Sequence, residues 1–203
     1  MTVSTTLCCA SFHDRLRRVV IRFAVLLLSL AAAPAHADEA TIRYAEIVPD
    51  RGQYVINADV SVTLAEPVID ALDEGIPINF VAEAAIDEPR WYWFDDTLVT
   101  AVLEFRLSYH PMTRSYRLAI GSLHQTFDSL DAALQTMQRI RRWPITDMQR
   151  LTPGQSYKVQ VRFRLDTSLL PRPFQVSTLG NGDWETESDW LRWTFLASPL
   201  PRQ

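Results

Sequence analysis

Hydrophobic and polar residues alternate along four stretches of this 203-residue chain. In the clearest of them, residues 157–165, the apolar side chains of Tyr157, Val159 and Val161 are separated by single polar residues. Successive side chains of a β-strand point to opposite faces of its sheet, so this period of two predicts strands with one dry and one wet face. Such strands are typical of antiparallel sheets. The other three stretches are 54–64, 76–86 and 99–107.

Short turn signals separate the predicted strands. They combine Pro, Gly, Asp and Ser, the residue types that turns favour. The three turns are expected at residues 49–52, at residues 110–113 and at Gly121-Ser122. These turns place a further strand at residues 42–48, ahead of the first turn. Alternation near the C-terminus predicts a last strand at residues 191–195.

Two helices are expected among the strands. Pro67 suits a first helical position and Gly75 a stop, which predicts a short helix over residues 67–74. A second helix is expected to begin with Asp128 as its cap and to place apolar residues on one face as far as Ile140. Its last turn would carry cations, which the helix dipole favours at that end. These cations are Arg139, Arg141 and Arg142.

About eight strands with one dry face each must close a core by pairing two sheets or by curling one sheet. We therefore expect a mainly β fold, an antiparallel two-sheet β-sandwich (immunoglobulin-like or similar) with two short helices. An up-and-down β-barrel is the alternative, because several connections are simple hairpins. Residues 38–203 show no internal repeat or linker, so we expect a single β-rich domain.

The first 37 residues have the pattern of a signal peptide. A basic segment that ends at Arg22 precedes a short apolar run at residues 23–33. Ala35-His36-Ala37 then supplies the small residues that a signal peptidase requires, which predicts cleavage after Ala37. We therefore expect a periplasmic protein. The alternative is an inner-membrane protein anchored by this segment uncleaved.

Processing would leave a cysteine-free and acidic chain. Cys8 and Cys9 both precede the apolar run, so no disulfide or thiolate chemistry is expected afterwards. Removal of residues 1–37 takes away four arginines and one aspartate, which leaves 16 basic and 23 acidic side chains and a net charge of −7. This charge argues against nucleic acid as a partner.

Several blocks of sequence resemble one known family. They are residues 75–80 (Gly-Ile-Pro-Ile-Asn-Phe), 90–95 (Arg-Trp-Tyr-Trp-Phe-Asp), 107–117, 161–175 and the tryptophan-rich 183–195. In this order they are similar to Domain of Unknown Function family 4390, exported proteins of proteobacteria. The resemblance implies an envelope location, with no established activity and no catalytic residues. Such proteins are often encoded beside a sensor histidine kinase, which hints at envelope sensing and at that kinase as a partner.

The most unusual stretch holds four consecutive aromatic residues between charged ones. A strand cannot direct all four inward, so about half of them must lie on the other face. We take Arg90, Trp91 and Trp93 as candidates for binding a protein, a sugar or a lipid. The structural alternative is that a helix covers this second face.

Four arginines are expected on the polar faces of the predicted strands. If their strands are neighbours, they would form a basic strip able to hold a carboxylate or a phosphate. The more ordinary alternative is that they pair across strands with acids such as Glu104 or Asp166. These arginines are Arg106, Arg117, Arg162 and Arg164.

No catalytic, metal-binding or cofactor-binding motif is present in the chain, so none of these sites is predicted. We expect a non-catalytic protein-interaction or sensing-accessory module of the cell envelope. The first alternative is a carrier of a lipid or a small apolar ligand between the sheets. The second is a hydrolase that would use His110 or His124, the two histidines after residue 37.

Overall fold

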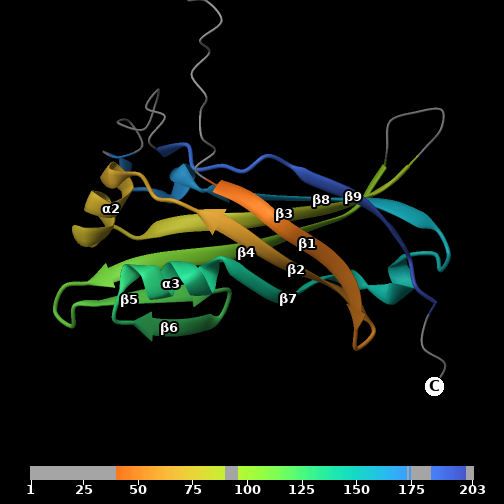
Figure 1. Ribbon diagram of the computed structural model, residues 1–203, viewed down its shortest axis with the longest axis horizontal. Coiled ribbons are helices and arrows are strands. Elements are labelled where there is room, and N and C mark those ends of the chain that lie inside the picture. Colours follow the sequence, from red (N-terminus) through yellow and green to blue (C-terminus); the bar gives the residue numbers. More distant parts are fainter. Residues whose placement is uncertain (1–39, 90–95, 173, 175–183, 200–203) are drawn as a thin grey trace, which may run out of the picture. The chain divides into compact units, whose positions relative to one another are not determined.

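The computed structural model describes residues 40–89, 96–172, 174 and 184–199 (Figure 1). The predicted signal peptide lies outside these residues, as do the candidates Arg90, Trp91 and Trp93. Within them, the chain forms nine strands in two antiparallel sheets, together with two α-helices. The mainly β fold predicted from the alternation is therefore confirmed.

The larger sheet has six strands in the order β6-β5-β4-β3-β8-β9. The first four follow one another along the chain as hairpins, and β8 returns to lie on the other side of β3. The predicted turns at residues 110–113 and at Gly121-Ser122 connect the strands of two of these hairpins, β4 with β5 and β5 with β6. The strands are β3 (Ile78–Glu88), β4 (Asp96–His110), β5 (Ser115–Ile120), β6 (Leu123–Phe127), β8 (Ser156–Leu165) and β9 (Leu191–Leu196).

The smaller sheet consists of β1 (Ala40–Asp50), β2 (Gln53–Val62) and β7 (Arg139–Asp147), with β2 in the centre. It crosses in front of the larger sheet in Figure 1, where β1 contacts β8 and β9 and β7 contacts β4. No ladder joins the two sheets in the part of the chain that is described. The architecture is thus a sandwich, and the barrel alternative does not apply to it.

The core lies between the facing sheets. The alternating apolar residues of β8, from Tyr157 to Leu165, are at most 5% exposed. At their centre the ring of Phe163 stacks on Phe80 at 5.7 Å between centroids and lies 5.8 Å from the ring of Phe105. Burial of each such side chain stabilises the fold by roughly 1.5–3 kcal/mol. The polar residues between them therefore point to the outer face of the larger sheet.

The two helices lie on the core side of the larger sheet. Helix α2 (Glu66–Asp73) is one residue from its predicted position, and it contacts β4. The hydroxyl of Tyr116 on β5 donates a hydrogen bond to Asp73 at 3.2 Å and so ties the end of α2 to the sheet. Helix α3 (Leu130–Met137) covers β5 and β6 (Figure 1). Neither described helix has the length and apolar character that a membrane crossing requires.

The predicted extent of the second helix is wrong. Its cap is Ser129, whose Oγ accepts a hydrogen bond from the backbone N–H of Ala132 at 3.3 Å. The helix ends at Met137, and the three arginines expected in its last turn belong to β7. Pairing with β2 buries Ile140 and Trp143 of this segment. This tertiary burial outweighs the weak local preference for continuing the helix.

Candidate functional site

The outer face of the larger sheet carries all four candidate arginines, but in two separate pairs. Arg106 and Arg117 lie on the neighbouring strands β4 and β5. Arg162 and Arg164 lie on β8, and β3 separates that strand from β4. The predicted basic strip is therefore divided, and the two pairs have different neighbours.

Arg162 and Arg164 hold the carboxylate of Glu83 on β3 between them. We call these three residues the Glu83 clamp. Arg162 donates to Glu83 Oε2 through Nη2 at 2.6 Å and through Nε at 3.2 Å. Arg164 donates to Oε1 through Nη2 at 2.9 Å and through Nε at 3.0 Å. Each guanidinium thus makes two hydrogen bonds to one oxygen, so both carboxylate oxygens are satisfied.

Further groups complete the surroundings of the clamp. Nη1 of Arg162 donates to Glu187 at 2.6 Å, and the guanidinium carbon lies 4.6 Å from the ring centre of Trp190. Arg164 forms a longer ion pair with Asp166 at 3.7 Å, but Asp166 directly follows the same strand, so the cross-strand pairing of this arginine is the one with Glu83. The side chains of the three clamp residues are only 21–29% exposed. The charged groups of Arg162 and Arg164 are therefore used in contacts within the chain.

The clamp changes the ionisation of its members. Burial raises the pKa of the Glu83 carboxyl, but the hydrogen bonds and charges of the two arginines outweigh burial and hold that pKa below its usual value. In turn, the hydrogen bond to Glu83 raises the pKa of Arg162 against the opposing effect of burial. Both shifts favour the charged pair, which is the behaviour of a structural ion-pair network.

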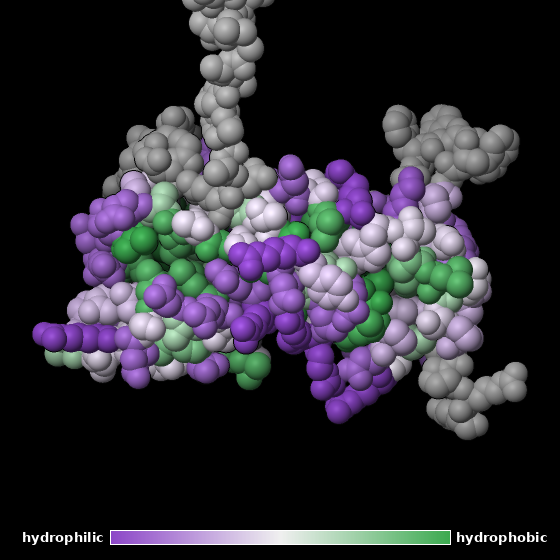
Figure 2. All heavy atoms as spheres, in the orientation of Figure 1, coloured by the Kyte–Doolittle hydropathy of each residue, from purple (hydrophilic) through white to green (hydrophobic). Residues whose placement is uncertain are grey.

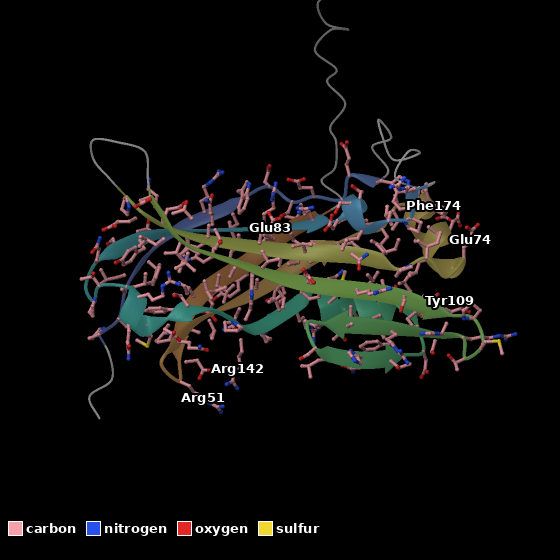
Figure 3. All side chains as sticks on the ribbon, turned by 180° about the vertical axis from the view of Figure 1, so that it is seen from behind. Arg51, Glu74, Glu83, Tyr109, Arg142 and Phe174 are labelled. Atoms are coloured by element: carbon pink, nitrogen blue, oxygen red, sulfur yellow. The ribbon has the colours of Figure 1, made fainter. Side chains whose placement is uncertain are left out.

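Arg106 and Arg117 instead line an open groove of about 670 Å³ toward one end of the sheet. In Figure 3, which views the molecule from behind, Glu83 lies midway along β3, and Tyr109 marks the end of β4 that carries the groove. We call it the anion groove and define it by the polar side chains that line it. They are Asn79, Glu104, Arg106, Ser108, His110, Arg117 and His124.

Small residues on β5 explain the hollow. Ala119 lies in register between Arg106 on β4 and His124 on β6, and Gly121 ends the strand. Both small residues line the groove, so no side chain fills the space between Arg106 and His124. The longer side chains on either side form its walls. A ligand could therefore approach the sheet closely at this position.

Neither groove arginine forms an ion pair with an acid among the residues that the structure describes. Glu104 also lines the groove, but neither Arg106 nor Arg117 has a carboxylate of the described residues within the 4.0 Å of an ion pair. Both arginines are exposed, and their positions on adjacent strands are diagonal neighbours. The groove therefore combines positive charge with hydroxyl and amide groups, which suits a carboxylate or phosphate.

The family model for Domain of unknown function (DUF4390) matches residues 37–194. The chain belongs to this family. The match includes all nine strands except the last two residues of β9, and it includes both pairs of arginines. No curated protein and no solved structure matches the chain significantly. Membership in DUF4390 supplies no activity, so the function must be argued from the residues.

The anion groove of this DUF4390 chain also gathers Ser108, His110 and His124, the residues that a hydrolase would need. A nucleophile and its base act through a hydrogen bond between them. Within the described residues, no hydrogen bond joins any two of these three side chains. No group of three or more described His, Cys, Asp and Glu residues could hold a metal ion. The arrangement thus supports binding better than catalysis.

The sequence analysis named Arg106 and Arg117, but it did not identify Glu83 as the shared partner of the other two candidate arginines. Glu83 is a polar residue within the alternating stretch 76–86, but its role depends on β8 lying beside β3, a pairing between distant segments. Glu83 is in register with Arg162, and Val81 is in register with Arg164. The two-residue turn at Gly121-Ser122 was the only local signal that could have placed His124 beside Ala119 and Arg106.

Proposed function

We propose that this chain is a non-catalytic protein-interaction module exported to the periplasm, and that its anion groove receives an acidic group of an envelope protein. A sensing accessory that contacts the periplasmic part of a sensor histidine kinase is one form of this function. The proposal rests on one observation. Two exposed arginines lie together in a groove without a described carboxylate partner.

The Glu83 clamp makes this observation more informative. The same sheet face satisfies Arg162 and Arg164 fully with its own acids, so the fold can neutralise arginines where they serve structure. Arginines are enriched at protein interfaces, because the planar guanidinium binds a carboxylate through two parallel hydrogen bonds. The groove is also a local exception on a chain of net negative charge. Such an exception favours a partner with an acidic surface.

The test is in-cell crosslinking and capture of the tagged chain, followed by mass spectrometry of the retained proteins and lipids. The informative variant is R106E/R117E, which reverses the charge of the groove. The matched control is R51E/R139E, which makes the same change in the β1–β2 turn and on β7, at arginines that also have no described ion-pair partner. We expect the unmodified chain and the control to capture the same envelope protein and R106E/R117E to lose it. Equal capture by all three would refute the proposal.

A second candidate function is the transport of a lipid or small apolar ligand. Its support is an apolar area of surface beside α2 and α3, which Figure 2 shows on the face that carries the smaller sheet. Partly buried apolar residues of both helices, Ile69, Leu130 and Leu134, pack against the core nearby. The same capture experiment separates the two functions. Enrichment of lipid without protein, unchanged in R106E/R117E, would favour the carrier.

A further inference from the structure

Strand β6 forms one edge of the larger sheet. It pairs with β5 on one side, and no described strand pairs with its other side (Figures 1 and 3). Four of its five residues are exposed, and Leu123 is 74% exposed. None of the described backbone contacts outside the ladders involves residues 123–127. Nothing in the described part of the chain therefore pairs with one row of β6 backbone groups, and such an unpaired edge can accept a hydrogen-bonding strand.

The other edge strands are protected in ways that β6 is not. Proteins block edge pairing with charged side chains or with proline. Strand β1 contains Arg43 and Pro49, strand β7 contains three arginines and Pro144, and strand β9 contains Arg192. Strand β6 has the sequence Leu-His-Gln-Thr-Phe, with neither a proline nor an acidic, lysine or arginine residue. Among the four edges of the described sheets, β6 is the one open to strand addition.

The same strand borders the anion groove. His124 of β6 lies in register with Ala119, and Thr126 lies in register with Arg117. Neighbouring strands lie about 4.8 Å apart, so a strand added to β6 would lie about 10 Å from β5. An arginine and a glutamate side chain together span that distance, because each is several ångströms long and Thr126 between them is short.

We propose that β6 accepts an extended acidic segment of a protein partner as a seventh strand, with a carboxylate of that segment reaching Arg117 and the charge of Arg106 adding to the attraction. This inference rests on the proposed function, for which it specifies the form of the partner. Backbone hydrogen bonds along β6 supply affinity, and the charged groove supplies specificity. The partner segment carries acidic residues at alternate positions, because only every second side chain faces the groove.

A second copy of this chain is a less suitable occupant. Antiparallel pairing of two β6 strands would continue the sheet and place the grooves of both copies on the same face. Arg117 of each copy would then approach the like charges of the other, which opposes association. An acidic segment instead meets the two arginines with opposite charge.

The test uses three synthetic nine-residue peptides and the full chain purified from the cell envelope. The first alternates glutamate with valine, and the second alternates lysine with valine. The third is the glutamate peptide with N-methyl groups on its three central residues. These groups block backbone pairing from either edge and leave the charges unchanged. Binding is measured by fluorescence anisotropy, and amide hydrogen exchange locates it on the chain.

We expect the glutamate peptide to bind at least tenfold more tightly than either of the other two. We also expect it to protect amides of residues 123–127 and to lose at least tenfold in affinity for R106E/R117E, but not for R51E/R139E. Equal binding of the N-methylated peptide would overturn strand addition while leaving charge recognition at the groove intact. No preference for glutamate would overturn this inference, and the capture experiment would still decide the proposed function separately. Concentration-dependent dimers that protect the same amides without peptide would overturn it in favour of a second copy.

Discussion

Two pairs of arginines lie on one face of the same sheet, and they serve different purposes. Arg162 and Arg164 hold Glu83 between them in four hydrogen bonds of 2.6–3.2 Å. Arg106 and Arg117 line an open groove and have no described carboxylate within ion-pair distance. Arg106, Arg162 and Arg164 all lie within stretches of the same alternation of apolar and polar residues. The residue on the neighbouring strand therefore decides whether an arginine pairs within the fold or can bind a partner.

Register explains why each pair has the neighbours it has. Glu83 on β3 lies directly opposite Arg162 on β8, and two residues along the ladder Val81 lies opposite Arg164. On the other side of β3, Glu104 lies opposite that same valine, so Val81 stands between Glu104 and Arg164. Arg106 lies opposite Asn79, an uncharged residue. A shift of two residues in the register of β4 or β8 against β3 would place Glu83 or Glu104 beside different arginines.

The largest effect is expected from neutralising the structural pair in R162Q/R164Q. This change removes the hydrogen bonds that offset the burial of Glu83, and it also removes the contacts of Arg162 with Glu187 and Trp190. We expect a loss of about 3 kcal/mol in the free energy of unfolding. That loss corresponds to a drop of roughly 6–12 °C in the melting temperature. Urea and thermal unfolding measure both, and a loss below about 0.5 kcal/mol would contradict a structural role.

A smaller loss, about 2 kcal/mol, is expected from Glu83→Gln. The two guanidinium groups would lose their shared carboxylate, but Arg162 would keep Glu187 and Arg164 would keep Asp166. The matched control is Glu104→Gln, because Glu104 lies on the same face of the next strand and pairs with neither groove arginine. We expect this control to change the stability by less than about 0.5 kcal/mol. Equal losses in both variants would show that charge alone, without the clamp geometry, accounts for the effect.

The clamp also predicts a dependence of stability on pH. The pKa of Glu83 is lower in the folded protein than its usual value near 4.5 in the unfolded chain. The stabilisation by its charge is therefore complete above that usual value and is lost as pH falls through the lower folded value. We expect the difference between the unmodified chain and Glu83→Gln to shrink over this acidic range, as measured by urea unfolding at successive pH values. A difference that stays constant from neutral to acidic pH would contradict the prediction.

Local patterns were sufficient for much of the fold. Alternation predicted the buried faces of β2, β3, β4 and β8, and turn residues predicted the hairpins. The end of the second helix was wrong because Ile140 continues its apolar face and is also the residue that β7 buries against β2. Only the pairing of β7 with the distant β2 decides whether Ile140 ends a helix or belongs to a strand. The periodicity of apolar residues along the chain does not contain this information.

The candidate site was predictable to a lesser extent. The expectation that all four arginines lie on a polar face is confirmed, although Asp166 pairs with Arg164 from the end of the same strand and not across strands. The alternation could not show that β3 separates the two pairs or that Glu83 serves one of them, since both facts depend on strand order. The groove itself arises from the absence of bulk at Ala119 and Gly121. Small residues on a strand do not predict a groove until the side chains on the neighbouring strands are known.

The smallest effect on stability is expected from R106Q/R117Q, the same chemical change as R162Q/R164Q on the other side of β3. Neither groove arginine has a described acid to lose, so the free energy of unfolding should change by less than about 0.5 kcal/mol. At low salt the change should be slightly stabilising, because it removes two like charges on diagonal positions of adjacent strands. High salt screens this repulsion and should abolish the gain. Urea unfolding at low and high salt measures both the size and the sign. A loss comparable with that of R162Q/R164Q would mean that the groove arginines stabilise the fold themselves, and they would then not be available to a partner.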